Sequence, residues 1–161
     1  MDTIKAAIFD LDGTLVDSMW VWERIDMEFL KKRGYTVPEN LKDNITHLSF
    51  KQVAQYFKTT FSIDDSVEAI MDEWHEMAYN EYSNNVFLKE GAMEYLHSLK
   101  KAGIKIALAT SNSKPLLEAT LKNNGIYDLF DSITVTDEVK KGKDNPDIYL
   151  LAAEKLNVNP V

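Results

Sequence analysis

The sequence predicts an α/β protein, a doubly wound parallel sheet with a Rossmann-like core and an inserted all-helical cap. Three short, almost uninterrupted apolar segments, residues 4–9, 104–109 and 133–135, are typical of strands in a parallel sheet. The first of them reads as a strand buried on both faces. Amphipathic helical patterns precede and follow the second strand and follow the third, and this alternation favours parallel pairing.

The helices around these strands have clear boundaries in the sequence. One helix is predicted over residues 92–102, and it ends before Gly103. The next helix begins at Pro115, a residue suited to a first helical turn, and stops at Gly125. After a basic loop, Pro146 opens a last helix. We therefore predict a discontinuous core from residues 1–16 and 86–161.

Residues 17–85 contain helical patterns and no good strand, which predicts a separate helical cap domain. A helix capped by Ser18 runs to about Arg33, and a short helix follows over residues 39–44. Ser49 and Gln52 have the spacing of a capping box. A longer helix covers residues 65–82, and its Met and aromatic stripe is expected to form a small core.

Composition limits the classes of function. The chain has 161 residues, a formal net charge of −8 and no cysteine, which excludes disulfides and thiolate metal sites. Its acidity argues against nucleic acid and anionic membranes as partners, but not against a small phosphorylated ligand. No apolar run approaches the ~18 residues of a membrane span, and no export signal is visible. We expect a cytoplasmic protein.

Polar residues follow each predicted strand at its carboxyl end, where parallel sheets place their ligands. Asp10 and Asp12 end the first strand. Two carboxylates this close repel each other, and a bound divalent cation usually offsets that repulsion. Gly13 allows a tight turn that leaves backbone amides free to face an anion. The second strand ends in Thr110-Ser111-Asn112, and Lys143 lies beyond the third. Taken singly, the segment after the second strand could be a helix cap and Lys143 a solvated surface charge. Taken together, these residues predict a site for phosphoryl transfer.

These segments resemble the motifs of the haloacid dehalogenase-like hydrolase superfamily, in the branch of β-phosphoglucomutases and small phosphosugar phosphatases. The first motif corresponds to DLDGTLVDS (residues 10–18), and the second to LATSN (residues 108–112). The third corresponds to GKDNPD (residues 142–147), with Asp144 where proline is usual. The predicted helical insertion resembles the helical cap of the family, so the resemblance covers essentially the whole chain.

The resemblance implies a role for each of these residues. Asp10 would attack phosphorus and form an aspartyl-phosphate, and Asp12 would act as general acid and then general base. The Asp10 carboxylate and the Asp12 backbone carbonyl would hold Mg²⁺. Thr110, the amide that follows it and Lys143 would bind the transferring phosphoryl group. Further substrate or phosphate contacts are expected from Gly13, Thr14, Ser111, Asn112 and, in the cap loop, His47.

One part of the family pattern is not found. The fourth motif is an acidic pair after a fourth strand, and only 18 residues follow Lys143 here. From this the chain is expected to be truncated before that motif, with weak Mg²⁺ affinity and little turnover. The first strand would then form an open apolar edge, so self-association by strand pairing is expected.

The resemblance implies a Mg²⁺-dependent phosphomonoester hydrolase that acts on a small phosphorylated metabolite. A phosphosugar mutase is the alternative, although Thr46, His47 and Phe50 replace the basic residues and glycine of the mutase cap loop. Another alternative for the chain as given is an inactive fragment or an interaction protein. Dehalogenase chemistry is disfavoured, because the second aspartate followed by Gly-Thr points to phosphoryl transfer.

Overall fold

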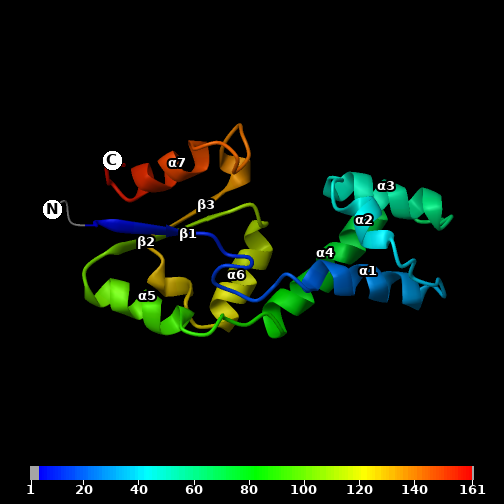
Figure 1. The fold of residues 1–161 in the computed structure, drawn as a ribbon, viewed down its shortest axis with the longest axis horizontal. Helices are drawn as coiled ribbons and strands as arrows, with labels where there is room; N and C mark the ends of the chain where they lie inside the picture. The colour runs from blue at the N-terminus through cyan, green and yellow to red at the C-terminus, as the bar shows by residue number, and fades with distance from the viewer. Residues whose placement is uncertain (1–3, 161) are drawn as a thin grey trace. The chain divides into compact units, whose positions relative to one another are not determined.

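The computed structural model describes residues 4–160, and the chain divides into two compact units (Figure 1). The first unit combines residues 1–18 with residues 82–161, and the second is Met19–Glu81. The chain therefore leaves the first unit after Ser18 and returns to it at Tyr82.

A three-stranded parallel sheet forms the centre of the first unit. Its strands are β1 (Ala6–Phe9), β2 (Lys105–Thr110) and β3 (Ser132–Val135), in the order β1-β2-β3. Both pairs are parallel, so the three carboxyl ends lie along one edge of the sheet. The parallel sheet predicted from the apolar segments is confirmed.

Helices cover both faces of this sheet, as the doubly wound prediction requires (Figure 1). Helix α7 (Asp147–Lys155) lies on one face, where Ala6 and Ile8 of β1 pack against a cluster that includes Ala152. Helix α5 (Ala92–Lys101) lies on the other, where the Phe9 and Tyr95 ring centroids are 6.0 Å apart. Helix α6 (Lys114–Asn123) and the short 3-10 helices η1 (Tyr127–Leu129) and η2 (Thr136–Glu138) complete this unit.

The two outer strands of the sheet differ in how their free edges are covered. At β3, Glu138 accepts a hydrogen bond from the Val135 amide, and Lys155 donates one to the Ile133 carbonyl. Glu138 and Lys155 also form an ion pair at 2.6 Å, so the β3 edge is closed by side chains. No comparable pair lies along β1 within residues 4–160.

The prediction that β1 is buried on both faces is wrong. All four of its residues are only half-buried, whereas five of the six residues of β2 are fully buried. The reason is position, because β1 pairs with β2 alone among the strands of the described chain. An apolar composition shows that a strand belongs to a sheet but not whether both of its sides are covered.

The second unit is helical and has its own aromatic core. It contains α1 (Val21–Lys32), α2 (Leu41–Ile45), α3 (Phe50–Thr60) and most of α4 (Val67–Asn84). Phe29, Phe57 and Trp74 are almost completely buried, with ring centroids 5.0–6.0 Å apart. The expected core of Met and aromatic stripes is confirmed for its aromatic members, and both hydrogen bonds of the Ser49–Gln52 capping box are present.

The predicted helix cap at Ser18 is wrong. Helix α1 begins at Val21 after Trp20, and the Trp20 side chain makes no capping hydrogen bond. Ser18 is buried and donates its hydroxyl hydrogen bond to Asp12 instead.

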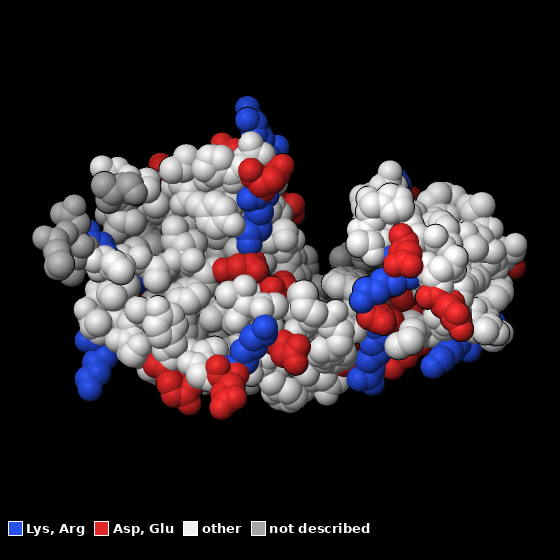
Figure 2. Space-filling view, in the orientation of Figure 1, with Lys and Arg blue, Asp and Glu red and all other residues white. Residues whose placement is uncertain are grey.

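The surface agrees with an acidic protein of mixed charge. Basic and acidic side chains are interspersed on the face shown in Figure 2, and the described residues of that face form no broad basic region. Within residues 4–160, no helix has the length and apolar character needed to cross a membrane. The cytoplasmic location stays a prediction.

Candidate active site

Asp10 and Lys143 meet at the carboxyl end of the sheet, although 133 positions separate them in the sequence. The Lys143 Nζ donates to Asp10 Oδ1 at 2.6 Å and to the Ala109 carbonyl at 3.1 Å. Asp10 directly follows β1, and the loop after β3 carries Lys143 back over the ends of β1 and β2. The lysine thus offsets the negative charge of Asp10, and both side chains stay partly open to solvent.

Asp12 is held by three side-chain donors. The hydroxyls of Tyr82 and Ser18 donate to Oδ1 at 2.5 and 2.8 Å, and the Asn112 amide donates to Oδ2 at 3.0 Å. Both carboxylate oxygens therefore have partners, and their geometry fixes the orientation of the side chain. Asn112 was predicted as a phosphate-binding residue, and the structure places its amide on Asp12.

Tyr82 is the residue of this site that sequence reasoning missed. It lies near the end of α4, only 2% of its surface is exposed, and 70 positions separate it from Asp12. Burial, the charge of Asp12 and the hydrogen bond to Asp12 together raise the pKa of Tyr82 well above its usual range. Tyr82 is therefore a permanent donor. The sequence signal that could have found it is a tyrosine at the return point from a helical insertion.

The turn after Asp12 is tight, but its amides are not free. Gly13 has a φ of 76°, a conformation that a glycine adopts without strain. The Gly13 amide donates to the Val16 carbonyl at 3.0 Å, and the Thr14 amide donates to the Leu11 carbonyl at 3.2 Å. The expectation that the turn leaves these amides facing an anion is wrong, because the turn uses them to close itself. The Thr14 hydroxyl points to Asp10 Oδ2 at 3.3 Å.

The residues that follow β2 lie beside the two aspartates. Thr110 is the last residue of β2 and is buried, and its hydroxyl accepts a hydrogen bond from the backbone amide of Asn112 at 3.0 Å. Ser111 is exposed. Thr110 thus shapes the turn that directs Asn112 toward Asp12.

His47 belongs to the helical unit rather than to the unit that carries these residues. It is exposed on the turn between α2 and α3. Its predicted substrate contact stays a prediction.

The donor set suits a hard cation with few protein ligands. Mg²⁺ prefers oxygen ligands and is commonly bound through one or two carboxylates, waters and substrate phosphate oxygens. The Asp10 carboxylate offers such oxygens at the open end of the sheet. In the described part of the chain no three acidic or histidine side chains converge on a common point. A metal here would depend on Asp10, a backbone carbonyl and the bound phosphate.

Comparison with known proteins agrees with this arrangement. The sequence matches the haloacid dehalogenase-like hydrolase family over residues 4–161. The chain belongs to this family. Family membership makes the protein a hydrolase, and the fold and motifs derived above are those of its β-phosphoglucomutase-like branch.

Two relatives and one solved structure illustrate the likeness. The chain is 31% identical to a phosphorylated carbohydrates phosphatase of Thermotoga maritima, over 98% of this chain and 73% of the relative. It is 33% identical to hexitol phosphatase A of Escherichia coli, over 97% and 70% of the two chains. A candidate β-phosphoglucomutase of Thermotoga maritima superposes with a TM-score of 0.88 at 30% identity, over 98% and 73% of the two chains.

Proposed function

We propose that the protein is a Mg²⁺-dependent phosphomonoester hydrolase that acts on a small phosphorylated metabolite, most suitably a phosphorylated sugar or sugar alcohol. The observation that carries this proposal is the contact of Lys143 with Asp10, beside an Asp12 that is oriented by three donors. The names of the two phosphatase relatives support the substrate class.

In the proposed reaction Asp10 is the nucleophile. Its carboxylate oxygen attacks phosphorus, and the bond between phosphorus and the substrate oxygen breaks as Asp12, which begins this step in its acid form, gives its proton to that oxygen. Asp12 then takes a proton from water, the water oxygen attacks the aspartyl-phosphate, and inorganic phosphate and the Asp10 carboxylate are released. Lys143 stabilises the negative charge on the transferring group throughout.

The chain's own residues would hold Mg²⁺ through the Asp10 carboxylate and the Asp12 backbone carbonyl. When bound, the ion supplies positive charge against the phosphate oxygens. Lys143 supplies a second positive charge, 2.6 Å from Asp10, and keeps that carboxylate aligned. Ser18, Tyr82 and Asn112 hold Asp12 in place while it moves the proton.

Hydrolysis is favoured over phosphosugar mutase chemistry. The two sequence relatives named above are phosphatases. In this chain Thr46 and His47 lie on the turn between α2 and α3, and Phe50 is the first residue of α3. The two reactions differ in the acceptor of the phosphoryl group, which is water in one and a sugar in the other. Product analysis with a sugar bisphosphate separates them.

The test is a panel of phosphomonoesters with Mg²⁺ under single-turnover conditions, in which enzyme exceeds substrate and slow hydrolysis is still detected. We expect release of inorganic phosphate from at least one phosphosugar or phosphorylated sugar alcohol. Asp10→Asn should reduce this rate by about 10⁴-fold or more, because it removes the nucleophile. Asp137→Asn, an exposed aspartate of η2, is the control. No hydrolysis of any substrate would favour an interaction protein instead.

We also propose that the chain self-associates through β1, with a second copy of the chain as the partner. The Lys5 carbonyl accepts from the Lys105 amide, so the outward amides of β1 are those of Ala6 and Ile8. The surface over β1 carries few charged side chains in Figure 2, and Ile4 is 71% exposed. Such an edge can pair with a copy of itself.

Sedimentation velocity at micromolar concentrations tests this pairing. We expect dimers for the native sequence and monomers for Ala6→Pro, which removes one outward amide and leaves the pairing with β2 intact. A native chain that stays monomeric over the whole concentration range contradicts the proposal.

A further inference from the structure

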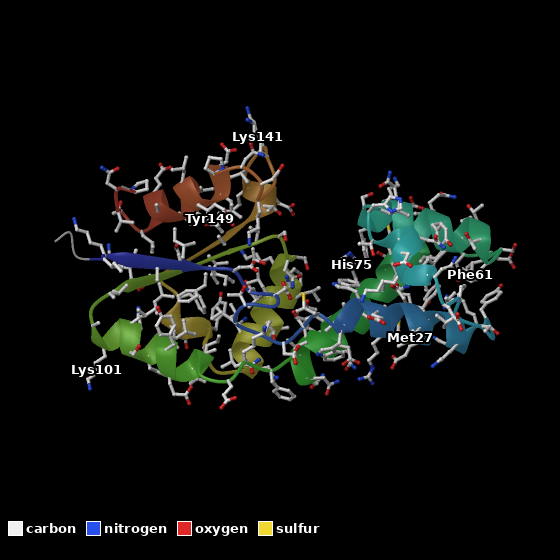
Figure 3. The ribbon with its side chains drawn as sticks, viewed as in Figure 1. Met27, Phe61, His75, Lys101, Lys141 and Tyr149 are labelled. Atoms are coloured by element: carbon white, nitrogen blue, oxygen red, sulfur yellow. The ribbon has the colours of Figure 1, made fainter. Side chains whose placement is uncertain are left out.

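A groove of about 520 Å³ lies within the helical unit, between α1 and the segment that leads into α2. Met27, labelled on α1 in Figure 3, is one of its lining residues. The apolar part of its wall includes Trp22, Met27, Val37, Pro38, Leu41 and Ile45. The groove is large enough for a small organic molecule and is formed by residues of one unit only.

Asp26 of α1 lies in this apolar wall without a partner. It is half-buried, and within residues 4–160 no donor hydrogen-bonds to its carboxylate and no cation pairs with it. Burial, with a smaller contribution from the charge of Glu23, raises the pKa of Asp26 to about 7. A buried carboxylate without a donor is costly to the folded state.

The other charged groups that line the groove do not satisfy Asp26. Glu23 is exposed and pairs with Lys42 of α2 at 3.3 Å, so that lysine already has a partner. Lys31 and Glu39 are exposed residues of the groove wall, and within residues 4–160 neither forms a hydrogen bond or an ion pair with Asp26. The lining therefore has three acidic and two basic side chains, which leaves a net negative charge beside apolar walls.

We infer that this groove is a binding site for a small organic cation, a primary ammonium group carried on an apolar body. The ammonium donates hydrogen bonds to the Asp26 carboxylate, and the body packs against the apolar wall that includes Trp22 and Leu41. The ammonium group would satisfy the carboxylate through a charge-assisted hydrogen bond, and the apolar body would cover the apolar wall. An anionic ligand would be repelled by the Asp26 carboxylate, and Lys31, the lining cation that has no ion-pair partner over residues 4–160, forms no ion pair with Asp26.

The experiment compares hexylammonium, 1-hexanol and hexanoate as probes of the full chain. Binding is followed by NMR of the Met27 methyl group and by calorimetry at pH 8.5. We expect hexylammonium to bind at least about tenfold more tightly than 1-hexanol, and hexanoate to bind more weakly than both. The preference for the ammonium should fade below pH 7, where Asp26 gains a proton.

Asp26→Asn keeps the size of the side chain and removes its charge. In this variant hexylammonium and 1-hexanol should bind with affinities within about twofold of each other, and retained 1-hexanol binding shows that the groove is still formed. Glu28→Gln is the matched control, since Glu28 lies on the same helix, pairs with Arg24 and does not line the groove. Equal affinities of hexylammonium and 1-hexanol in the native chain, or a preference for hexylammonium that survives Asp26→Asn, would overturn the inference.

Discussion

The carboxylates at the strand ends and the carboxylate in the α1 groove have opposite surroundings. Asp10 has Lys143 at 2.6 Å, and Asp12 receives hydrogen bonds from Tyr82, Ser18 and Asn112. Asp26 has no partner among the described residues and lies against an apolar wall. The two aspartates at the strand ends thus have donors around them, whereas the half-buried aspartate of the groove has none among the described residues.

This difference separates two uses of an acidic side chain. At the strand ends, donors fix the carboxylates in orientation, which reactions with a phosphate group require. In the groove, the unsatisfied carboxylate lowers the stability of the ionised protein and would gain from a cationic ligand. Substitutions at the strand ends should therefore change catalysis, and substitution of Asp26 should change stability and ligand binding.

A large effect, second only to that of Asp10→Asn, is expected when the cation of the strand-end site is removed. Lys143→Met should lower kcat/KM for the phosphomonoester by about 10²- to 10³-fold, because it removes the positive charge that lies beside Asp10 and the transferring phosphoryl group. Lys141→Met, in the same loop and exposed, is the control and should leave kcat/KM within about twofold. Equal effects of the two substitutions would show that only the net charge of the loop matters.

A smaller effect is expected when one donor to Asp12 is removed. Tyr82→Phe deletes the hydroxyl and leaves the hydrogen bonds from Ser18 and Asn112, so kcat should fall about tenfold while KM stays within about twofold. Tyr79→Phe is matched to it, since Tyr79 lies one turn earlier on α4 and is 53% exposed. A change in KM alone after Tyr82→Phe would mean that Tyr82 affects substrate binding rather than the position of Asp12.

Substitution of Asp26 in the groove is expected to have the smallest effect on catalysis and to raise the stability of the chain. The pKa of Asp26 is about 7 in the folded chain and about 3.9 in unfolded chains, so the folded state binds the proton more tightly. The free energy of unfolding therefore falls as the pH rises from about 4 through 7. Asp26→Asn should stabilise the chain by about 2 kcal/mol at pH 8.5 and by clearly less at pH 5.5.

Urea unfolding of Asp26→Asn at both pH values measures this change, with Glu28→Gln as the control that should show no such pH dependence. The phosphatase activity of Asp26→Asn should equal that of the native chain. A variant that is less stable than the native chain at pH 8.5 would mean that the Asp26 carboxylate has a favourable partner.

Much of this fold follows from local patterns that the sequence displays. Short apolar segments predict β1, β2 and β3, and the rule that parallel strands end along one edge brings Asp10 and Lys143 together. The capping box at Ser49 is also local, because both of its hydrogen bonds join residues three positions apart. These features depend on neighbours in the sequence or on sheet topology, and both can be inferred from residue types.

The features that could not be predicted depend on contacts between distant side chains. Ser18 has the residue type of a helix cap, and only the fold shows that its hydroxyl is used by Asp12. Tyr82 reads as one more apolar position of a long helix. Asp26 lies within an amphipathic pattern, and its lack of a partner appears only once the groove is formed. Local patterns predict elements, but tertiary packing decides which polar groups are satisfied.

The proposal that Asp10 is the nucleophile is tested most directly by trapping its covalent intermediate. The protein is mixed with Mg²⁺ and a phosphosugar that it hydrolyses, and the reaction is quenched in acid within the first turnover. Reduction with borohydride then converts an aspartyl-phosphate to homoserine. Mass spectrometry of the peptide that contains residues 10–18 should find homoserine at position 10, and none in Asp10→Asn. Phosphate release without any modification of Asp10 under the same quench would contradict the account.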